Sequence, residues 1–184
     1  MKRLILVFSL ALMLIPASLM GQAKHKDYTL PEEPNRAKYI DFPSLDKGLW
    51  FAVQATPAFF STGGGFGIHG ELIAGYRFGE FIKVGAGIAP GIIGSSFNMP
   101  IFLDARGNII SQESRMAVPY WNVDIGYSVG QVYKGFYASP TVGIRIGMPR
   151  NDFLAGLTYM MQIVPAIPNS TVVHGIGLKL GFEF

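Results

Sequence analysis

The C-terminal stretch HGIGLKLGFEF (174–184) sorts its residues into two sets with a period of two. One set is entirely apolar and consists of Ile176, Leu178, Leu180, Phe182 and Phe184. The other mixes glycine with charge and consists of Gly177, Lys179, Gly181 and Glu183. Because successive side chains of a strand point to opposite faces, this pattern predicts a β-strand with one apolar face. A helix would mix Lys179 and Glu183 into the apolar set.

The same alternation recurs from Gly48 to the end of the chain. It predicts eight strands, at residues 48–61, 66–78, 81–94, 99–109, 118–129, 135–147, 152–164 and 172–184. The connectors between them are rich in Gly, Pro, Asn and Ser, as hairpin connections are. Each strand with its connector takes about 17 residues of the stretch 48–184, which is too short for crossover helices. The prediction is therefore an all-β antiparallel meander.

The second face of these strands identifies the kind of sheet. It combines charged residues with glycines in almost every strand, although only 15% of the chain is charged and 23 residues are glycine. A soluble sandwich would place long polar side chains on its outer face. A narrow barrel needs glycine inside for space, and opposite charges inside can pair. We therefore predict an eight-stranded antiparallel up-and-down transmembrane β-barrel whose second face lines the lumen.

The predicted luminal polar network contains residues from most of the strands. Its members are His69, Glu71, Arg77, Lys83, Asp104, Arg106, Asn122, Asp124, Arg145, Lys179 and Glu183. Five of these carry positive charge and four carry negative charge. Charges of this kind are too costly to bury unpaired, so we expect them to interlock and to fill the lumen without an open water channel.

The apolar face is then expected to meet lipid. Membrane strands need about 9–11 residues, and these segments are long enough. Aromatic residues concentrate near the strand ends, where the girdles of a membrane barrel lie. The predicted girdle residues are Phe78, Phe81, Trp121, Tyr127, Tyr133, Phe136, Tyr137, Phe182 and Phe184.

The first 47 residues differ from the rest. Lys2-Arg3, an apolar run from Leu4 to Ile15 and small residues up to Gly21 predict a cleaved signal peptide at 1–21. Residues 22–47 hold five Lys/Arg, five Asp/Glu and three prolines without a periodic apolar face, which predicts an extended periplasmic tail or linker. Loss of Lys2 and Arg3 leaves 13 basic and 12 acidic residues, a net charge of +1. This balance gives no reason to expect a nucleic-acid partner.

Several segments resemble a known family. MPIFLDARGN (99–108), VPYWNVDIGYSVG (118–130), GFYASPTVGIRIG (135–147) and HGIGLKLGFEF (174–184) resemble small outer-membrane β-barrel proteins of Bacteroidetes. The resemblance implies an outer-membrane location and a C-terminus on the periplasmic side. It also implies that Phe182 and Phe184 act as the signal read by the barrel assembly machinery during insertion. It supplies no catalytic motif that matches this chain.

The pattern G-x-G-x-x-G at 65–70 is also found in dinucleotide-binding loops. Such a loop needs a helix directly after it, whereas the following residues keep a period of two, so we expect no nucleotide or other cofactor. His69 and Glu71 share the luminal face, and they are interpreted either as a hydrogen-bonded node of the lumen or as an acid–base pair. His25, His69 and His174 lie far apart and the chain has no cysteine, so no metal site is expected.

The predicted function is that of a non-enzymatic integral outer-membrane barrel, structural or an accessory subunit of a larger outer-membrane complex. The connectors expected on the outer side are short, unlike those of a receptor, and the favoured partner contacts are the tail and the connector 111–116. One alternative is a lipid-modifying barrel enzyme with a lateral gap near Pro57 or Pro90, where missing backbone donors weaken strand pairing. The other is a narrow conduit for small apolar molecules.

Overall fold

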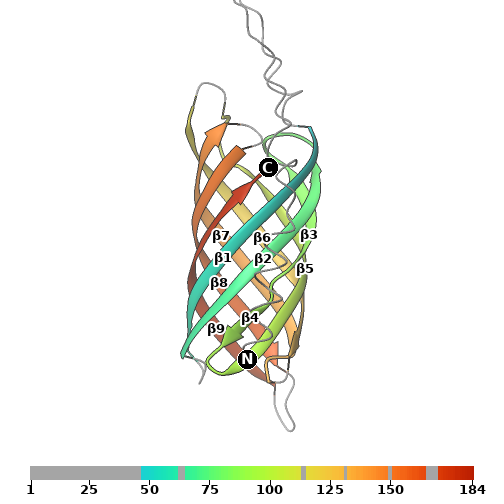
Figure 1. Cartoon of the computed structure of the whole chain (residues 1–184), viewed down its shortest axis with the longest axis vertical. Helices are drawn as coiled ribbons and strands as arrows, with labels where there is room; N and C mark the ends of the chain where they lie inside the picture. The colour runs from blue at the N-terminus through green and yellow to red at the C-terminus, as the bar shows by residue number, and fades with distance from the viewer. Residues whose placement is uncertain (1–46, 62–64, 113–114, 131, 149–150, 165–169) are drawn as a thin grey trace, which may run out of the picture. The chain divides into compact units, whose positions relative to one another are not determined.

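The structure, a computed structural model, describes residues 47–61, 65–112, 115–130, 132–148, 151–164 and 170–184. These residues form one antiparallel sheet (Figure 1). Its strands are β1 (Gly48–Phe60), β2 (Gly65–Arg77), β3 (Lys83–Ile88), β4 (Gly91–Ile93), β5 (Ser96–Asn108), β6 (Ala117–Gly130), β7 (Gly135–Met148), β8 (Asn151–Val164) and β9 (Thr171–Glu183). The predicted signal peptide and almost all of the predicted tail lie outside the described residues.

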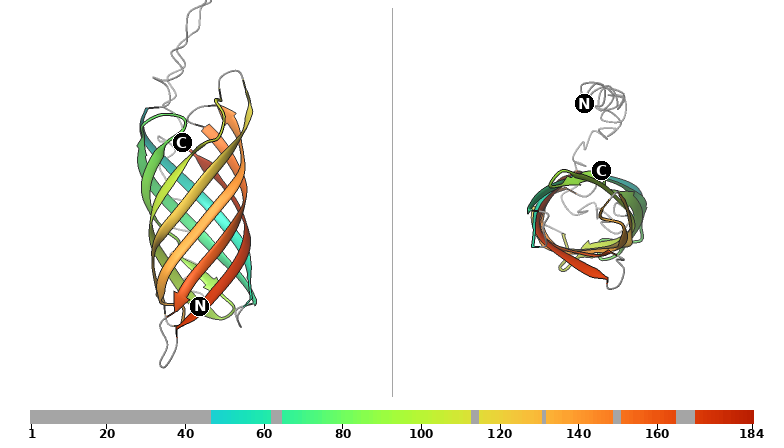
Figure 2. Two further views of the ribbon diagram at one scale, coloured as in Figure 1. Left: turned by 180° about the vertical axis from the view of Figure 1, so that it is seen from behind. Right: turned by 90° about the horizontal axis from the view of Figure 1, so that it is seen from below.

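The sheet closes on itself. β1 pairs with β2 on one side and with β9 on the other, and from β5 to β9 each strand pairs with the next one in the chain. The end-on view of Figure 2 shows the resulting ring of strands. β3 and β4 form a single interrupted strand between β2 and β5. The predicted fold, a closed eight-stranded antiparallel barrel, is thus confirmed.

Strand register determines how wide the barrel is. The paired residues can be followed once around the wall, through Gly48, Arg77, Lys83, Arg106, Asn122, Thr141, Thr158, Gly177 and Ala58. The path returns to β1 ten residues further along than it started. A stagger of this kind tilts the strands, and with eight of them the interior is just wide enough for side chains to fill it.

The third strand departs from its predicted range of 81–94. It begins at Lys83 and is interrupted at Ala89 and Pro90, because proline has no N–H to donate to the ladder. The wall stays paired across this interruption: Gly70 N–H donates to the Pro90 carbonyl and Ala89 N–H to the Pro100 carbonyl, both at 2.9 Å. The fourth strand begins at Ser96 rather than 99, so only Gly94 and Ser95 turn the chain.

The two faces differ in polarity as expected, and two aromatic residues correct the expected girdle. Large apolar side chains cover the outside of every strand, and the charged side chains of the strands lie inside. Tyr133 and Tyr137 are buried inside the barrel rather than exposed in a girdle. Tyr137 falls on the opposite face from its exposed neighbour Phe136. No helix long and apolar enough to cross a membrane occurs among the described residues.

The two rims of the barrel differ in which ends of the chain they carry. β1 begins and the chain ends at one rim, where Phe51 and Phe184 exchange two backbone hydrogen bonds of 3.1 and 2.8 Å. This rim is called the C-terminal end, and the opposite rim is called the far end (Figure 1).

The spacing of β5 and β6 predicts a strict need for glycine at 126. A Cβ there would overlap the carbonyl oxygen of Ile101 and lie 2.6 Å from Cα of Phe102. Both are backbone atoms of the paired strand, so Gly126→Ala should lower the free energy of unfolding by about 1–3 kcal/mol. Urea unfolding of the barrel in detergent measures this change.

Gly70→Ala is the matched control, because a Cβ at Gly70 meets nothing closer than the Pro90 carbonyl at 3.9 Å. Its effect should stay within about 0.5 kcal/mol. Equal effects of the two substitutions would contradict the strand spacing described here.

Candidate functional site

The eleven predicted luminal residues all lie inside the barrel. The side chains of His69, Glu71, Arg77, Lys83, Asp104, Arg106, Asn122, Asp124, Arg145, Lys179 and Glu183 are each at most 1% exposed. They come from six strands, β2, β3, β5, β6, β7 and β9. Their inward direction follows from the period-two alternation of each strand.

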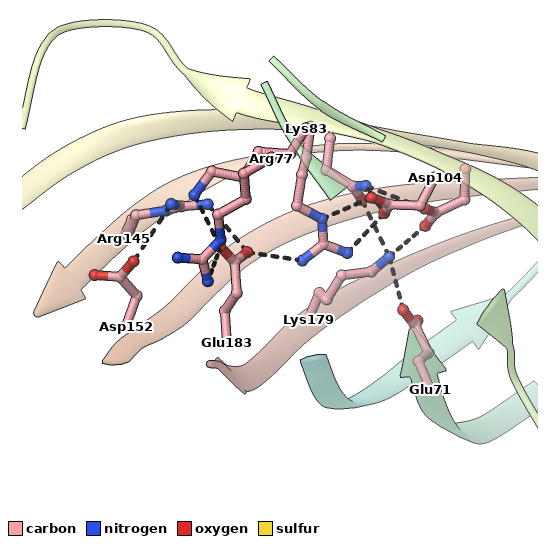
Figure 3. A network of polar contacts seen from close by, with 11 residues as sticks. Glu71, Arg77, Lys83, Asp104, Arg145, Asp152, Lys179 and Glu183 are labelled. Atoms are coloured by element: carbon pink, nitrogen blue, oxygen red, sulfur yellow. Dashed lines mark hydrogen bonds and ion pairs between the residues drawn. The ribbon is translucent and has the colours of Figure 1, made fainter. Parts of the chain in front are cut away.

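Glu183, the second residue from the C-terminus, lies at the centre of a cluster of cations (Figure 3). Its carboxylate contacts Lys83 Nζ at 2.9 Å, Arg145 Nη2 at 3.1 Å, Arg77 Nη2 at 3.3 Å and Arg106 Nη1 at 3.4 Å. These four partners belong to β7, β5, β3 and β2, so one carboxylate on β9 connects strands around most of the wall.

Two further carboxylates balance this cluster. Asp152 lies 3.3 Å from Arg145 Nη1. Asp104 forms a two-pronged pair with Arg106, at 2.8 Å to Nε and 2.6 Å to Nη2. Bidentate contacts of this kind fix the guanidinium plane as well as its charge. The same guanidinium lies 4.6 Å from the centre of the Trp50 ring, a cation–π distance.

A second part of the network surrounds Lys179. Its ammonium group contacts Asp124 at 2.6 Å and Glu71 at 3.0 Å. Asp104 and Asp124 face each other across β5 and β6, which would be unfavourable for two like charges alone. Asn122 donates to both carboxylates, at 2.5 Å to Asp104 and 3.0 Å to Asp124. The network is therefore continuous from Asp152 to Glu71 (Figure 3).

Among the described residues, the buried charges are balanced. There are five cations, Arg77, Lys83, Arg106, Arg145 and Lys179, and five anions, Glu71, Asp104, Asp124, Asp152 and Glu183. Asp152 was absent from the predicted set. The alternation of β8 could have revealed it, because Asp152 shares a face with the buried Leu154 and Thr158.

A connector closes the network at the C-terminal end of the barrel. Gln112 is buried, although it belongs to the connector 111–116 that was expected to contact a partner. Its side-chain amide donates to Asp152 Oδ1 at 3.0 Å and to the Gly147 carbonyl at 3.2 Å. Its backbone N–H donates to Glu80 at 2.9 Å. Gln112 thus belongs to the barrel end, while Arg115 and Met116 are exposed.

His69 and Glu71 do not form the acid–base pair considered from the sequence. The two carboxylate oxygens of Glu71 contact Thr56 Oγ1 at 2.7 Å and Lys179 Nζ at 3.0 Å. Neither ring nitrogen of His69 has a hydrogen-bond partner among the described residues. The ring packs against Phe60, with centroids 6.2 Å apart, and a Cβ at Gly91 would overlap it. Gly91 therefore gives the imidazole its space.

Among the described residues, the half of the lumen nearer the far end contains no Asp, Glu, Lys or Arg side chain. Asn98 donates to Gln162 at 3.1 Å, accepts from Ser128, and lies beside an apolar cluster that includes Phe60, Ile93 and Met160. The sequence prediction did not include this neutral layer. Its residues alternate in the same way as the charged ones, but they carry no charge to mark them.

His174 lies outside the barrel, on the same face of the last strand as Ile176. Its Nδ1 is hydrogen-bonded to the hydroxyl of Tyr159 at 2.5 Å, and the two rings stack at 5.9 Å. No group of three or more His, Cys, Asp and Glu side chains suited to a metal ion occurs in the part of the chain that the structure describes.

The wall remains closed at both prolines where a lateral gap was considered. No β1–β9 pairing is formed by Pro57 itself, yet the strands are close together there. A Cβ at Gly177 would lie only 2.8 Å from the Pro57 carbonyl oxygen and 2.9 Å from Ala58 Cβ. Gly177 therefore lets β9 approach β1, and hydrogen bonds on both sides of Pro90 close the second position.

The fold and the lumen together define the class of molecule, a closed β-barrel with an apolar exterior and a charge-balanced interior. No protein-family model and no curated protein sequence matches the chain. Solved structures do match. The crystal structure of Neisserial surface protein A (NspA) gives a TM-score of 0.60 at 15% identity, over 73% of this chain and 95% of that one.

A second similar structure is the N-terminal β-barrel domain of Pseudomonas aeruginosa OprF. It gives a TM-score of 0.50 at 14% identity, over 75% of this chain and 99% of that one. At these identities the likeness concerns the fold, and the two comparisons agree on the small closed barrel.

The position of Glu183 predicts a large stability loss on neutralisation. Glu183→Gln leaves Arg77, Lys83, Arg106 and Arg145 without their shared anion, and breaking a buried ion pair costs about 3–5 kcal/mol. The urea unfolding midpoint in detergent should fall accordingly. Asp152→Asn is the control, because Asp152 contacts one cation rather than four, and its effect should be smaller.

A second variant separates loss of charge balance from loss of packing. Adding Lys83→Gln to Glu183→Gln restores the balance of buried charge and should recover part of the lost stability. Additive losses in the double variant would contradict the role given to charge balance.

Proposed function

We propose that the chain is an integral outer-membrane β-barrel without enzymatic activity, structural or an accessory subunit of a larger outer-membrane complex. The observation that carries this proposal is the continuous, charge-balanced network that fills the lumen from Asp152 to Glu71. Such a network connects the strands of the barrel wall. Its charged groups bind each other and are not available to a substrate.

The apolar exterior supports the membrane location. Phe51, Leu72, Ile101 and many other large apolar side chains are about half exposed on the outer face. In water such a surface would drive association, whereas in a bilayer it meets hydrocarbon. The signal peptide predicted at 1–21 and the likeness to a Neisserial surface protein favour the outer membrane.

The resemblance to outer-membrane barrels supplies the orientation. In it the C-terminal end, where β1 begins, faces the periplasm. The exposed side chains of Phe182 and Phe184 are then available to the barrel assembly machinery during insertion. The tail 22–47 and the exposed residues around Arg115 are the proposed contacts for a larger complex.

The network also argues against the two alternatives. A conduit needs an open or dry path, but five ion-paired cations and five anions occupy the described lumen. A lipid-modifying enzyme needs an assembled acid–base pair and a route for lipid to reach it. His69 has no hydrogen bond to Glu71 among the described residues, and the wall is paired around Pro57 and Pro90.

Planar-bilayer recording tests the filled lumen. The wild-type barrel should insert without producing stable conductance steps, because its charged side chains bind each other rather than water. Arg106→Ala combined with Lys179→Ala removes two of the largest luminal side chains and should produce measurable conductance. Stable steps from the wild-type protein would overturn the closed-barrel proposal.

Gentle detergent extraction tests the accessory role. The full chain should migrate in a complex larger than the monomer, with a reproducible set of co-purifying proteins identified by mass spectrometry. A variant lacking residues 23–46 should still insert but should migrate as a free barrel. A wild-type protein that is a clean monomer would remove the accessory-subunit proposal and leave the structural one.

A further inference from the structure

The outer wall carries an apolar depression of about 420 Å³ across β1, β2, β3 and β5. Its side-chain lining consists of Phe51, Val53, Leu72, Ala74, Ala86, Ile88 and Ile101. We propose that this depression is a binding site for an acyl chain of a membrane phospholipid. The inference uses the orientation proposed above to name the leaflet, and it does not depend on the accessory role.

The depression arises from the register of two strands. Ala74 on β2 is paired directly with Ala86 on β3, and both methyl groups point outward. Same-face neighbours along a strand lie two residues apart, so Leu72 and Ile88 stand next to this pair. Phe51 is paired with Ala74 from the other side. Two methyl groups therefore form a floor, and larger side chains, each with at least two more carbons than alanine, form its walls.

The shape favours a flexible chain over a protein surface. The rim residues Phe51, Leu72 and Ile101 are 51%, 52% and 50% exposed, so they project from the wall around the alanine floor. A flat partner face would rest on these side chains and would not reach Ala74 or Ala86. A void under such a face would lose van der Waals contacts outright. A polymethylene chain can enter between the ridges.

The chemistry of the lining favours an acyl chain in particular. None of the seven lining side chains carries a polar atom, so no headgroup or polar ligand would find a partner there. Within a bilayer the hydrophobic effect does not distinguish protein from lipid, and association depends on packing. A depression fitted to one chain supplies that packing, because a smooth barrel wall would offer fewer contacts.

The position along the barrel identifies the leaflet. Phe51 and Val53 lie near the start of β1, and Ala52 between them is paired with Glu183 of the last strand. The depression thus belongs to the half nearer the C-terminal end. In the proposed orientation this half faces the periplasmic leaflet, which is built of phospholipid.

Native mass spectrometry of the full chain tests this assignment. The protein is extracted from its own outer membrane in a mild detergent, and retained lipids are counted and identified for each variant. Ala74→Leu combined with Ala86→Leu fills the floor from outside without altering the lumen. Ala138→Leu is the matched control, because Ala138 also faces outward but lies on β7, away from the depression.

We expect the wild type and Ala138→Leu to retain a single phospholipid, and the double variant to retain at least tenfold less. A folded barrel migrates differently on a gel in unheated and in heated samples. This difference shows whether each variant is folded, so loss of lipid can be separated from loss of the barrel. Equal retention by the double variant, or a wild type without phospholipid, would overturn the proposal. Retention of lipopolysaccharide instead would overturn the leaflet assignment. A dimer that the double variant dissociates would identify a second copy as the occupant.

Discussion

The carboxylate of Glu183 is the interaction on which the rest of the barrel depends. It lies in the last strand and contacts four cations that come from β2, β3, β5 and β7. Each of these cations would be prohibitively costly to bury alone. The final strand therefore completes two things together: its backbone closes the sheet against β1, and its side chain balances the charges already assembled inside.

Barrel geometry explains why the network has this form. Eight strands with a stagger of ten residues leave an interior that side chains can fill only if some positions carry none. Glycines supply that space beside large inward side chains such as Trp50 and Tyr120, and at Gly126 the backbones of two paired strands approach closely. Charged residues and glycines thus share the inner face because a narrow interior needs both paired charges and space. The apolar side chains lie on the outer face.

The alternation of apolar and polar residues was enough to predict most of the fold and most of the candidate site. It predicted the eight strands and the inward direction of Glu71, Arg106 and Lys179. An odd or even position along the strand, here called parity, decides which face a residue occupies. Where parity was not applied, the prediction missed Asp152 and misplaced Tyr137. Where a proline interrupts the ladder, at Pro90, the strand broke although its parity continued.

Other features depend on the register between strands, so they could not be predicted from the sequence of any single strand. The outer depression exists because Ala74 lies opposite Ala86, and no local pattern states which alanines will be neighbours. The burial of Gln112 likewise depends on Asp152, forty residues away in the chain. Pairwise contacts of this kind appear only once the strands are aligned.

Glu183 is ion-paired inside a closed lumen, and a distance measurement in a lipid bilayer can check this pairing. Solid-state NMR dipolar recoupling between the labelled carboxyl carbon of Glu183 and the guanidinium nitrogens of Arg145 should give a measurable coupling, as expected for the 3.1 Å nitrogen–oxygen contact. The carboxylate should also show no contact with mobile water. A Glu183 carboxylate without coupling to Arg145 and in contact with mobile water would contradict the buried ion pair.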